Sequence, residues 1–66
     1  PRAAIDYFVG AIETDPRFAD AYFNLAMAYE QAGDRRAARG SWQRYLDLEP
    51  TGTWADIARE HLRDRP

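Results

Sequence analysis

The sequence predicts an all-α fold built from short antiparallel helices. Apolar residues recur at intervals of three and four rather than two, which is the periodicity of an amphipathic helix and not of a strand. Asp15-Pro16 and Glu49-Pro50 interrupt this periodicity, because a residue before proline avoids the helical region. The loops between the periodic segments are short, so consecutive helices should lie antiparallel.

Each expected helix has a local reason for where it begins or ends. The four helices are expected over residues 3–14, 18–32, 35–48 and 54–63. Gly33 is suited to end the second helix in a left-handed conformation, and Asp34 is suited to cap the third. Thr53 and Asp56 have the spacing of a capping box, with aspartate in place of the usual glutamate, at the start of the fourth.

One apolar face on each of the first three helices supplies the expected core. The three faces consist of Ala4, Tyr7, Phe8, Ala11 and Ile12; of Tyr22, Leu25, Ala26 and Tyr29; and of Ala38, Trp42, Tyr45 and Leu46. Burial of a Leu or Phe side chain contributes roughly 1.5–3 kcal/mol. About a dozen such residues hold so short a chain together only narrowly, and we expect Leu25 to be one of them.

The chain repeats itself with a period characteristic of one class of helical repeat. A shift of 34 residues brings four pairs into coincidence: Ala4 with Ala38, Phe8 with Trp42, Ile12 with Leu46, and Pro16 with Pro50. A helix–turn–helix unit of about 34 residues that cannot bury its own apolar face must stack on neighbouring units.

At these positions the sequence resembles the tetratricopeptide repeat family. Helix A of the family pattern is matched by Tyr22, Leu25, Ala26 and Tyr29, and the rest of that repeat by Gly33, Ala38, Trp42 and Pro50. A preceding helix B is matched by Ala4, Phe8, Ala11 and Pro16. Tyr45 departs from the pattern, which has a small residue there. The resemblance implies an α-solenoid fragment of about one and a half repeats plus a C-terminal capping helix.

The implied organisation has one domain, residues 1–66, in three parts. Residues 1–16 correspond to helix B of a partial repeat, 17–50 to a complete repeat, and 51–66 to the capping helix. A shift of 32 places Trp54, Ile57, Ala58 and His61 on the helix-A pattern. The last helix can therefore be a cap that covers the third helix, or the start of a further repeat.

Composition narrows the classes of function. The net charge is -2 with a pI near 5.2, which disfavours nucleic-acid binding, and no apolar run approaches the length of a membrane span. The absence of cysteine agrees with a cytoplasmic location. All nine basic residues are arginine, which is typical of a GC-rich bacterial genome. Because the first residue is Pro1, we expect the chain to belong to a longer protein.

No residue pattern indicates catalysis, a metal or a cofactor. His61 is the single histidine and has no second ligand at metal spacing, so we interpret it as a packed residue. Ser41 has no base near it in sequence and is also expected to pack, and no glycine-rich phosphate loop is present. Four arginines decorate the third helix and are interpreted as a solvated face: Arg35, Arg36, Arg39 and Arg44.

The resemblance implies a protein or peptide partner, since helices A of the family line a concave surface that holds peptides or partner helices. The expected partner-binding residues are Asp20, Phe23, Met27 and Glu30. Phe23 and Met27 are one helical turn apart and are not needed for the expected core, so they suit an adaptable apolar contact. Asp20 and Glu30 would favour a partner with some positive charge.

A second hypothesis is that the chain is a structural element that associates with itself. The helix A that would pack against residues 3–14 does not occur in this chain. The face carrying Tyr7, Phe8 and Ile12 should then be only partly covered, and exposed apolar faces usually mark interfaces. We therefore expect a homodimer or a higher assembly, formed through these three residues.

Overall fold

The structure, a computed structural model, describes residues 2–63 as four helices joined by short turns. They are α1 (Arg2–Thr14), α2 (Ala19–Gln31), α3 (Arg35–Leu48) and α4 (Thr53–Leu62). The expected all-α fold is confirmed, and no helix boundary differs from the expected one by more than one residue. The ends of the predicted first and last parts, at residues 1 and 64–66, lie outside the described residues.

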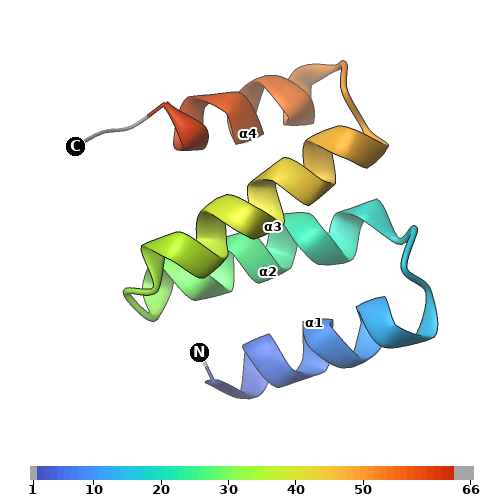
Figure 1. The fold of residues 1–66 in the computed structure, drawn as a ribbon, viewed down its shortest axis with the longest axis vertical. Coiled ribbons are helices and arrows are strands. Elements are labelled where there is room, and N and C mark those ends of the chain that lie inside the picture. The colour runs from blue at the N-terminus through green and yellow to red at the C-terminus, as the bar shows by residue number, and fades with distance from the viewer. Residues whose placement is uncertain (1, 64–66) are drawn as a thin grey trace.

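Each helix packs beside its neighbour in sequence and runs in the opposite direction, and α3 lies partly in front of α2 in the view of Figure 1. The most extensive contact joins α2 and α3, which occupy the middle of the stack. α1 packs against α2, and α4 packs against α3. The described residues therefore stack as consecutive helical hairpins, as expected for a fragment of a helical solenoid.

The core consists of two clusters separated by α2. The larger one joins α2, α3 and α4, and its buried members are Tyr22, Ala26, Ala38, Trp42, Tyr45 and Ala58. The smaller one joins α1 to α2 through Ile5, Leu25 and Ala28. The expectation that Leu25 is a core residue is confirmed. Ile5, which lay outside the expected apolar face, is the one buried residue of α1.

The reversal between α2 and α3 forms as the Gly-Asp pair predicts. Gly33 has a φ of 82°, and its N–H donates to the Glu30 carbonyl at 3.0 Å. The Asp34 N–H donates to the Tyr29 carbonyl at 2.9 Å, which completes the double hydrogen bond that ends many helices. The Asp34 carboxylate accepts from the Ala37 N–H at 3.1 Å and caps α3.

The capping box predicted at the start of α4 is wrong. Gly52, with a φ of 106°, is the N-cap residue, and no side chain caps this end. Thr53 is already the first helical residue, so its hydroxyl is one position too late for the capping role. The Asp56 carboxylate instead lies 3.5 Å from Arg59 one turn further along the helix.

Candidate functional site

A cavity lies over the larger core cluster where the first turns of α2 and α4 approach the end of α3. Its volume is about 290 Å³. We call it the aromatic pocket, and its lining residues are Asp20, Phe23, Asn24, Tyr45 and Trp54. Three helices therefore contribute to one site, and two of its residues lie on the expected partner-binding surface.

Phe23 is the centre of the aromatic pocket. Its ring lies edge to face with Tyr45 at 5.2 Å and with Trp54 at 5.5 Å between centroids. Beneath them, Phe23 also meets Trp42 at 4.8 Å and an interplanar angle of 88°. Such perpendicular arrangements are favoured by the quadrupole of the rings, which is negative on the faces. The aromatic walls of the pocket therefore pack on one another through Phe23.

The pocket carries negative charge from two helix ends. Burial raises the pKa of the Tyr45 phenol, and the nearby carboxylates of Glu49 and Asp20 raise that pKa further. The Asn24 amide donates to the Asp20 backbone carbonyl at 3.0 Å rather than to the Asp20 carboxylate. The ion pairs found within residues 2–63 engage neither Asp20 nor Glu49.

Phe23 and Met27 lie in different surroundings. Met27 is 41% exposed, as expected of a contact residue on the groove side of α2. Phe23 is only half-buried, but its contacts with Trp42 and Tyr45 make it part of the packing of α2 on α3. The expectation that Phe23 is not needed for the core is therefore wrong. The repeat period of 34 residues carries no information about α4, whose Trp54 packs against the Phe23 ring.

Glu30 holds three helices together. A single oxygen, Oε2, accepts from the Trp42 indole N–H at 2.9 Å and lies 3.0 Å from Nδ1 of His61. The imidazole stacks on the Trp42 ring at 4.4 Å and 24°. The prediction that His61 is a packed residue is confirmed. Glu30 remains on the expected partner-binding surface, but the structure gives it a structural role that the sequence did not reveal.

Trp54 and Tyr45 are pocket residues that the sequence analysis did not assign to the site. Trp54 is 62% exposed, although a shift of the sequence by 32 residues aligns it with Tyr22, which is buried. Tyr22 is covered by α3, whereas among residues 2–63 no helix covers α4 in the same way. The departure of Tyr45 from the family's small residue was the available signal, since a larger side chain at that place, although buried, reaches the lining of the cavity.

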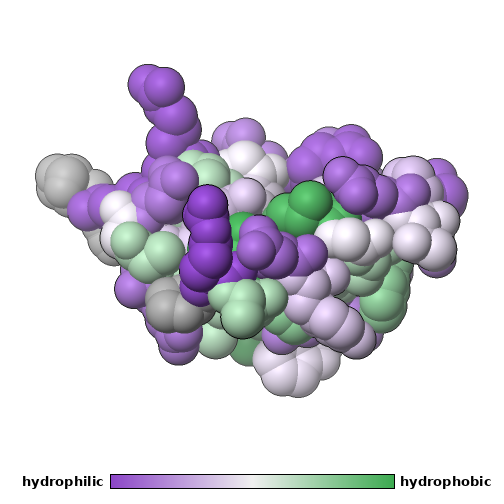
Figure 2. All heavy atoms as spheres, turned by 90° about the horizontal axis from the view of Figure 1, so that it is seen from below, coloured by the Kyte–Doolittle hydropathy of each residue, from purple (hydrophilic) through white to green (hydrophobic). Residues whose placement is uncertain are grey.

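One side of α1 forms the second candidate surface, and it is only partly covered, because Ala4 and Phe8 pack against the smaller core cluster while Tyr7 is exposed. We call it the open face of α1, and it comprises Ala4, Tyr7, Phe8 and Ala11. The residues 34 positions later are all buried, and they are Ala38, Ser41, Trp42 and Tyr45. Burial of Ser41 confirms it as a packing position. Figure 2 views the molecule from the α1 side, where green hydrophobic atoms lie between purple hydrophilic ones.

Tyr7 is the most exposed large side chain on the open face of α1. It is 71% exposed and lies edge to face with Phe8 at 5.2 Å. Phe8 is half-buried, whereas Ile12 touches both core clusters and serves the fold. The structure therefore separates the three residues expected to self-associate into one exposed, one partly exposed and one packed side chain.

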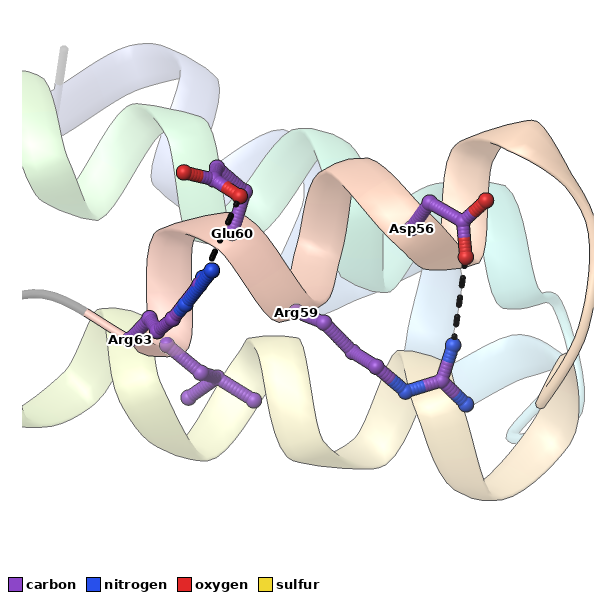
Figure 3. Close-up of a pocket in the computed structure, with 5 residues that line it drawn as sticks. Asp56, Arg59, Glu60 and Arg63 are labelled. Atoms are coloured by element: carbon purple, nitrogen blue, oxygen red, sulfur yellow. Dashed lines mark ion pairs between the residues drawn. The ribbon is translucent and has the colours of Figure 1, made fainter.

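A second cavity, of about 500 Å³, lies on the outer side of α4 (Figure 3). Its lining residues are Asp56, Arg59, Glu60, Leu62 and Arg63. Figure 3 shows that the charges pair along the helix, Asp56 with Arg59 at 3.5 Å and Glu60 with Arg63 at 3.6 Å. Because acids and bases alternate and neutralise one another, this cavity has no net charge to attract a ligand.

The remaining surface has the character expected of a solvated face. The four arginines of α3 are exposed, and Arg39 donates to the Leu62 carbonyl at 2.9 Å. Over residues 2–63, no three His, Cys, Asp or Glu side chains are grouped as a metal site. None of the four described helices combines the length and apolar character needed to cross a membrane.

This stack of helical hairpins, packed through small buried residues, defines a helical-repeat protein. A family model described as "Tetratricopeptide repeat" matches residues 7–39, from the second turn of α1 to the second turn of α3. The chain belongs to the tetratricopeptide repeat family. Repeats of this family generally mediate protein–protein interaction and are typically non-catalytic.

Two curated relatives carry the name antiviral innate immune response effector IFIT1. The Macaca fascicularis protein is 36% identical over 64 residues, which is 94% of this chain and 13% of the relative. The Homo sapiens protein is 39% identical over 49 residues, 74% of this chain and 10% of the relative. The chain thus spans a small part of the relatives' length. No solved structure matches the chain at comparable significance.

Proposed function

We propose that the chain is a cytoplasmic protein-interaction element that holds a peptide or a partner helix along the groove side of α2. The observation that carries this proposal is the aromatic pocket, whose Trp54 wall remains 62% exposed beside a preformed cavity. Exposed Met27 extends the apolar surface by one turn, and Asp20 and Glu30 flank it. Rigid aromatic side chains contribute contact area at a small entropic cost, which suits them to binding.

Selection of peptides against the immobilised chain tests this proposal. A phage library of random peptides is panned, and the affinities of the selected peptides are compared between wild type and two variants. Trp54→Ser and Met27→Glu should weaken binding while helicity is kept, because both side chains are exposed. Gln43→Ala, on the exposed side of α3, is the matched control and should leave binding unchanged.

Two outcomes contradict the groove. Peptides that bind Trp54→Ser and Met27→Glu as tightly as wild type would place the binding surface elsewhere. Failure to enrich any peptide from the library would contradict the proposal. Phe23→Ala is unsuitable as a test variant, because removal of a ring that packs on Trp42 and Tyr45 would weaken the fold itself.

The second candidate function is self-association through the open face of α1. The observation in its favour is the 71% exposure of Tyr7 on a face whose counterpart on α3 is buried. In that reading Tyr7 and Phe8 contact a second copy, and Ile12 supports them from beneath. A homodimer with a two-fold contact is the simplest assembly that covers the same face on both copies.

A further inference from the structure

The aromatic pocket combines an exposed indole with a carboxylate that forms no ion pair with any of residues 2–63. Trp54 contributes the accessible aromatic wall, and Asp20 lines the same cavity from the first turn of α2. Ion pairs within residues 2–63 engage Asp47, Asp56, Glu30 and Glu60, which leaves the Asp20 charge available to a ligand. The pocket therefore offers a π face and a negative charge in one place.

The chemistry of these walls selects against most side chains. An acidic side chain would meet the Asp20 carboxylate with like charge. An apolar side chain would displace water from that carboxylate without replacing its hydrogen bonds, which is unfavourable. A cation is attracted both by the aromatic faces and by the carboxylate.

We propose that the aromatic pocket binds an arginine side chain of a partner peptide, with the guanidinium against the Trp54 indole and the Asp20 carboxylate. This inference rests on the proposed function, since the arginine belongs to the peptide held along α2. The guanidinium is planar, weakly hydrated and rich in donors, so it stacks on a ring and donates to a carboxylate at once. The chain makes a related contact internally, where the Arg44 guanidinium lies 5.4 Å from the Tyr22 ring centroid.

The second charge near the pocket supports the same ligand. Glu49 ends α3 and, with Asp20, acts on the Tyr45 phenol that lines the cavity. Asp20 in the pocket lining and Glu49 near Tyr45 therefore make this end of the groove negative, although the Arg-rich surface of α3 lies on the same molecule. A ligand cation is attracted to this end of the groove, and its binding should weaken as salt is added.

Nuclear magnetic resonance titration with matched tripeptides tests the inference directly. The probes are acetyl-Gly-Arg-Gly-amide and the same peptide with citrulline, which has the shape of arginine but no charge. The arginine probe should shift the Trp54 indole N–H resonance and bind about tenfold more tightly than the citrulline probe. The indole N–H of Trp42, bonded to Glu30 beneath the pocket, is the internal reference and should move little.

A variant without the Asp20 charge tests whether this carboxylate recognises the arginine. Asp20→Asn keeps the size of the side chain and should bring the arginine-to-citrulline ratio close to one. Glu60→Gln, which removes an acid from the outer side of α4, should leave the ratio unchanged. Trp54→Leu should weaken both probes without unfolding the chain, because the indole is 62% exposed.

Several results would overturn the inference. Equal affinities for the arginine and citrulline probes would contradict the inference. So would a Trp54 indole resonance that does not shift when the arginine probe is added. A lysine tripeptide that binds as tightly as the arginine one contradicts the assignment of a guanidinium. If a folded Asp20→Asn variant still prefers the arginine probe to the citrulline probe as strongly as wild type does, the arginine is recognised at another place.

The inference and the proposed function can fail separately. If selected peptides bind the groove with no preference for arginine at this pocket, the inference fails and the proposed function stands. The arginine probe could bind as expected while the library yields no peptide that binds the chain. The pocket is then a site for cations, and the proposed function fails.

Discussion

The tight packing of this chain depends on a few alanines. Ala26 and Ala58 are completely buried, and Ala38 is 2% exposed. Small side chains at these places let the axes of neighbouring helices approach, and Trp42, 1% exposed, fills the space that remains. A core assembled from small and large residues in this way has little tolerance for a change of volume.

The first prediction concerns the volume of the smaller cluster. Leu25→Ala should reduce the free energy of unfolding by about 2–5 kcal/mol, because it leaves a cavity between α1 and α2. So small a domain should then be largely unfolded at room temperature. Circular dichroism during denaturation measures the effect, with exposed Met27→Ala as control. A melting temperature within a few degrees of wild type would contradict the core role of Leu25.

The second prediction concerns pH and Tyr45. Because the pKa of Tyr45 is raised by burial and by the carboxylates of Glu49 and Asp20, the folded chain keeps the phenolic proton after the unfolded chain has lost it. The stabilising contribution is complete below the ordinary pKa of about 10 and is lost as pH rises through the folded pKa. Urea denaturation above about pH 9 should show stability falling more steeply for wild type than for Tyr45→Phe. Identical slopes would show that Tyr45 is not the group responsible.

At the scale of the elements, α4 is held by its buried Ala55 and Ala58 and by a few specific side-chain contacts. Its first turn meets α2 through Trp54 and Phe23, and its last turn through His61 and Glu30. The Arg39 side chain also donates to the Leu62 carbonyl. Because one wall of the aromatic pocket is on α4, any loosening of this helix alters the pocket.

The third prediction compares two glycines in different elements. Gly33→Ala forces alanine to a φ of 82° and should destabilise the chain by about 1–2 kcal/mol. Gly10 lies inside α1 with open space where a Cβ would be. Gly10→Ala should therefore stabilise the chain by about 0.5–1 kcal/mol. Denaturant midpoints check both values, and a Gly33→Ala chain at least as stable as wild type would refute the helix-end assignment.

The fourth prediction concerns the docking of α4. His61→Ala removes the stack on Trp42 and the contact with Glu30, so α4 should separate from α2 more often. Hydrogen exchange should accelerate several-fold for amides of residues 57–63, with Leu25 little affected. Glu60→Gln, on the exposed side of the same helix, is the control. Unchanged exchange in α4 would mean that the apolar contact with α3 suffices.

At the scale of the whole molecule, the stack has two unequal ends. The most extensive contacts join helices that are neighbours in sequence, so α2 and α3 are covered on both sides while α1 and α4 each have one covered side among the described residues. Repeat arrays of this kind need a cap or a partner at each end. The charged outer side of α4 is suited to water, whereas the open face of α1 carries exposed Tyr7.

The fifth prediction is that the chain forms a homodimer through the open face of α1. Sedimentation equilibrium from micromolar to tens-of-micromolar concentration should show a mass above that of the monomer. Tyr7→Arg should shift the equilibrium to monomer without loss of helicity, because the side chain is 71% exposed. A monomeric mass throughout, with a melt independent of concentration, would rule out self-association.

The sequence by itself determined the helices, their turns and the family. These features depend on local chemistry: the three-four spacing, the prolines after Asp15 and Glu49, and the Gly33-Asp34 pair that ends one helix and caps the next. The repeat period also lies in the sequence, because equivalent helices need the same small and large residues. The weakest local signal, the capping box at Thr53, was also the one that failed.

Only the tertiary structure decided which faces are covered and which side chains form the site. Trp54, Phe23 and Tyr45 belong to three helices, and their meeting depends on the angle at which α4 packs rather than on any spacing in the chain. Glu30 was expected at the surface, but contacts with α3 and α4 engage its carboxylate. The physical reason is that periodicity defines a face of each helix, whereas contacts between distant residues decide what that face meets.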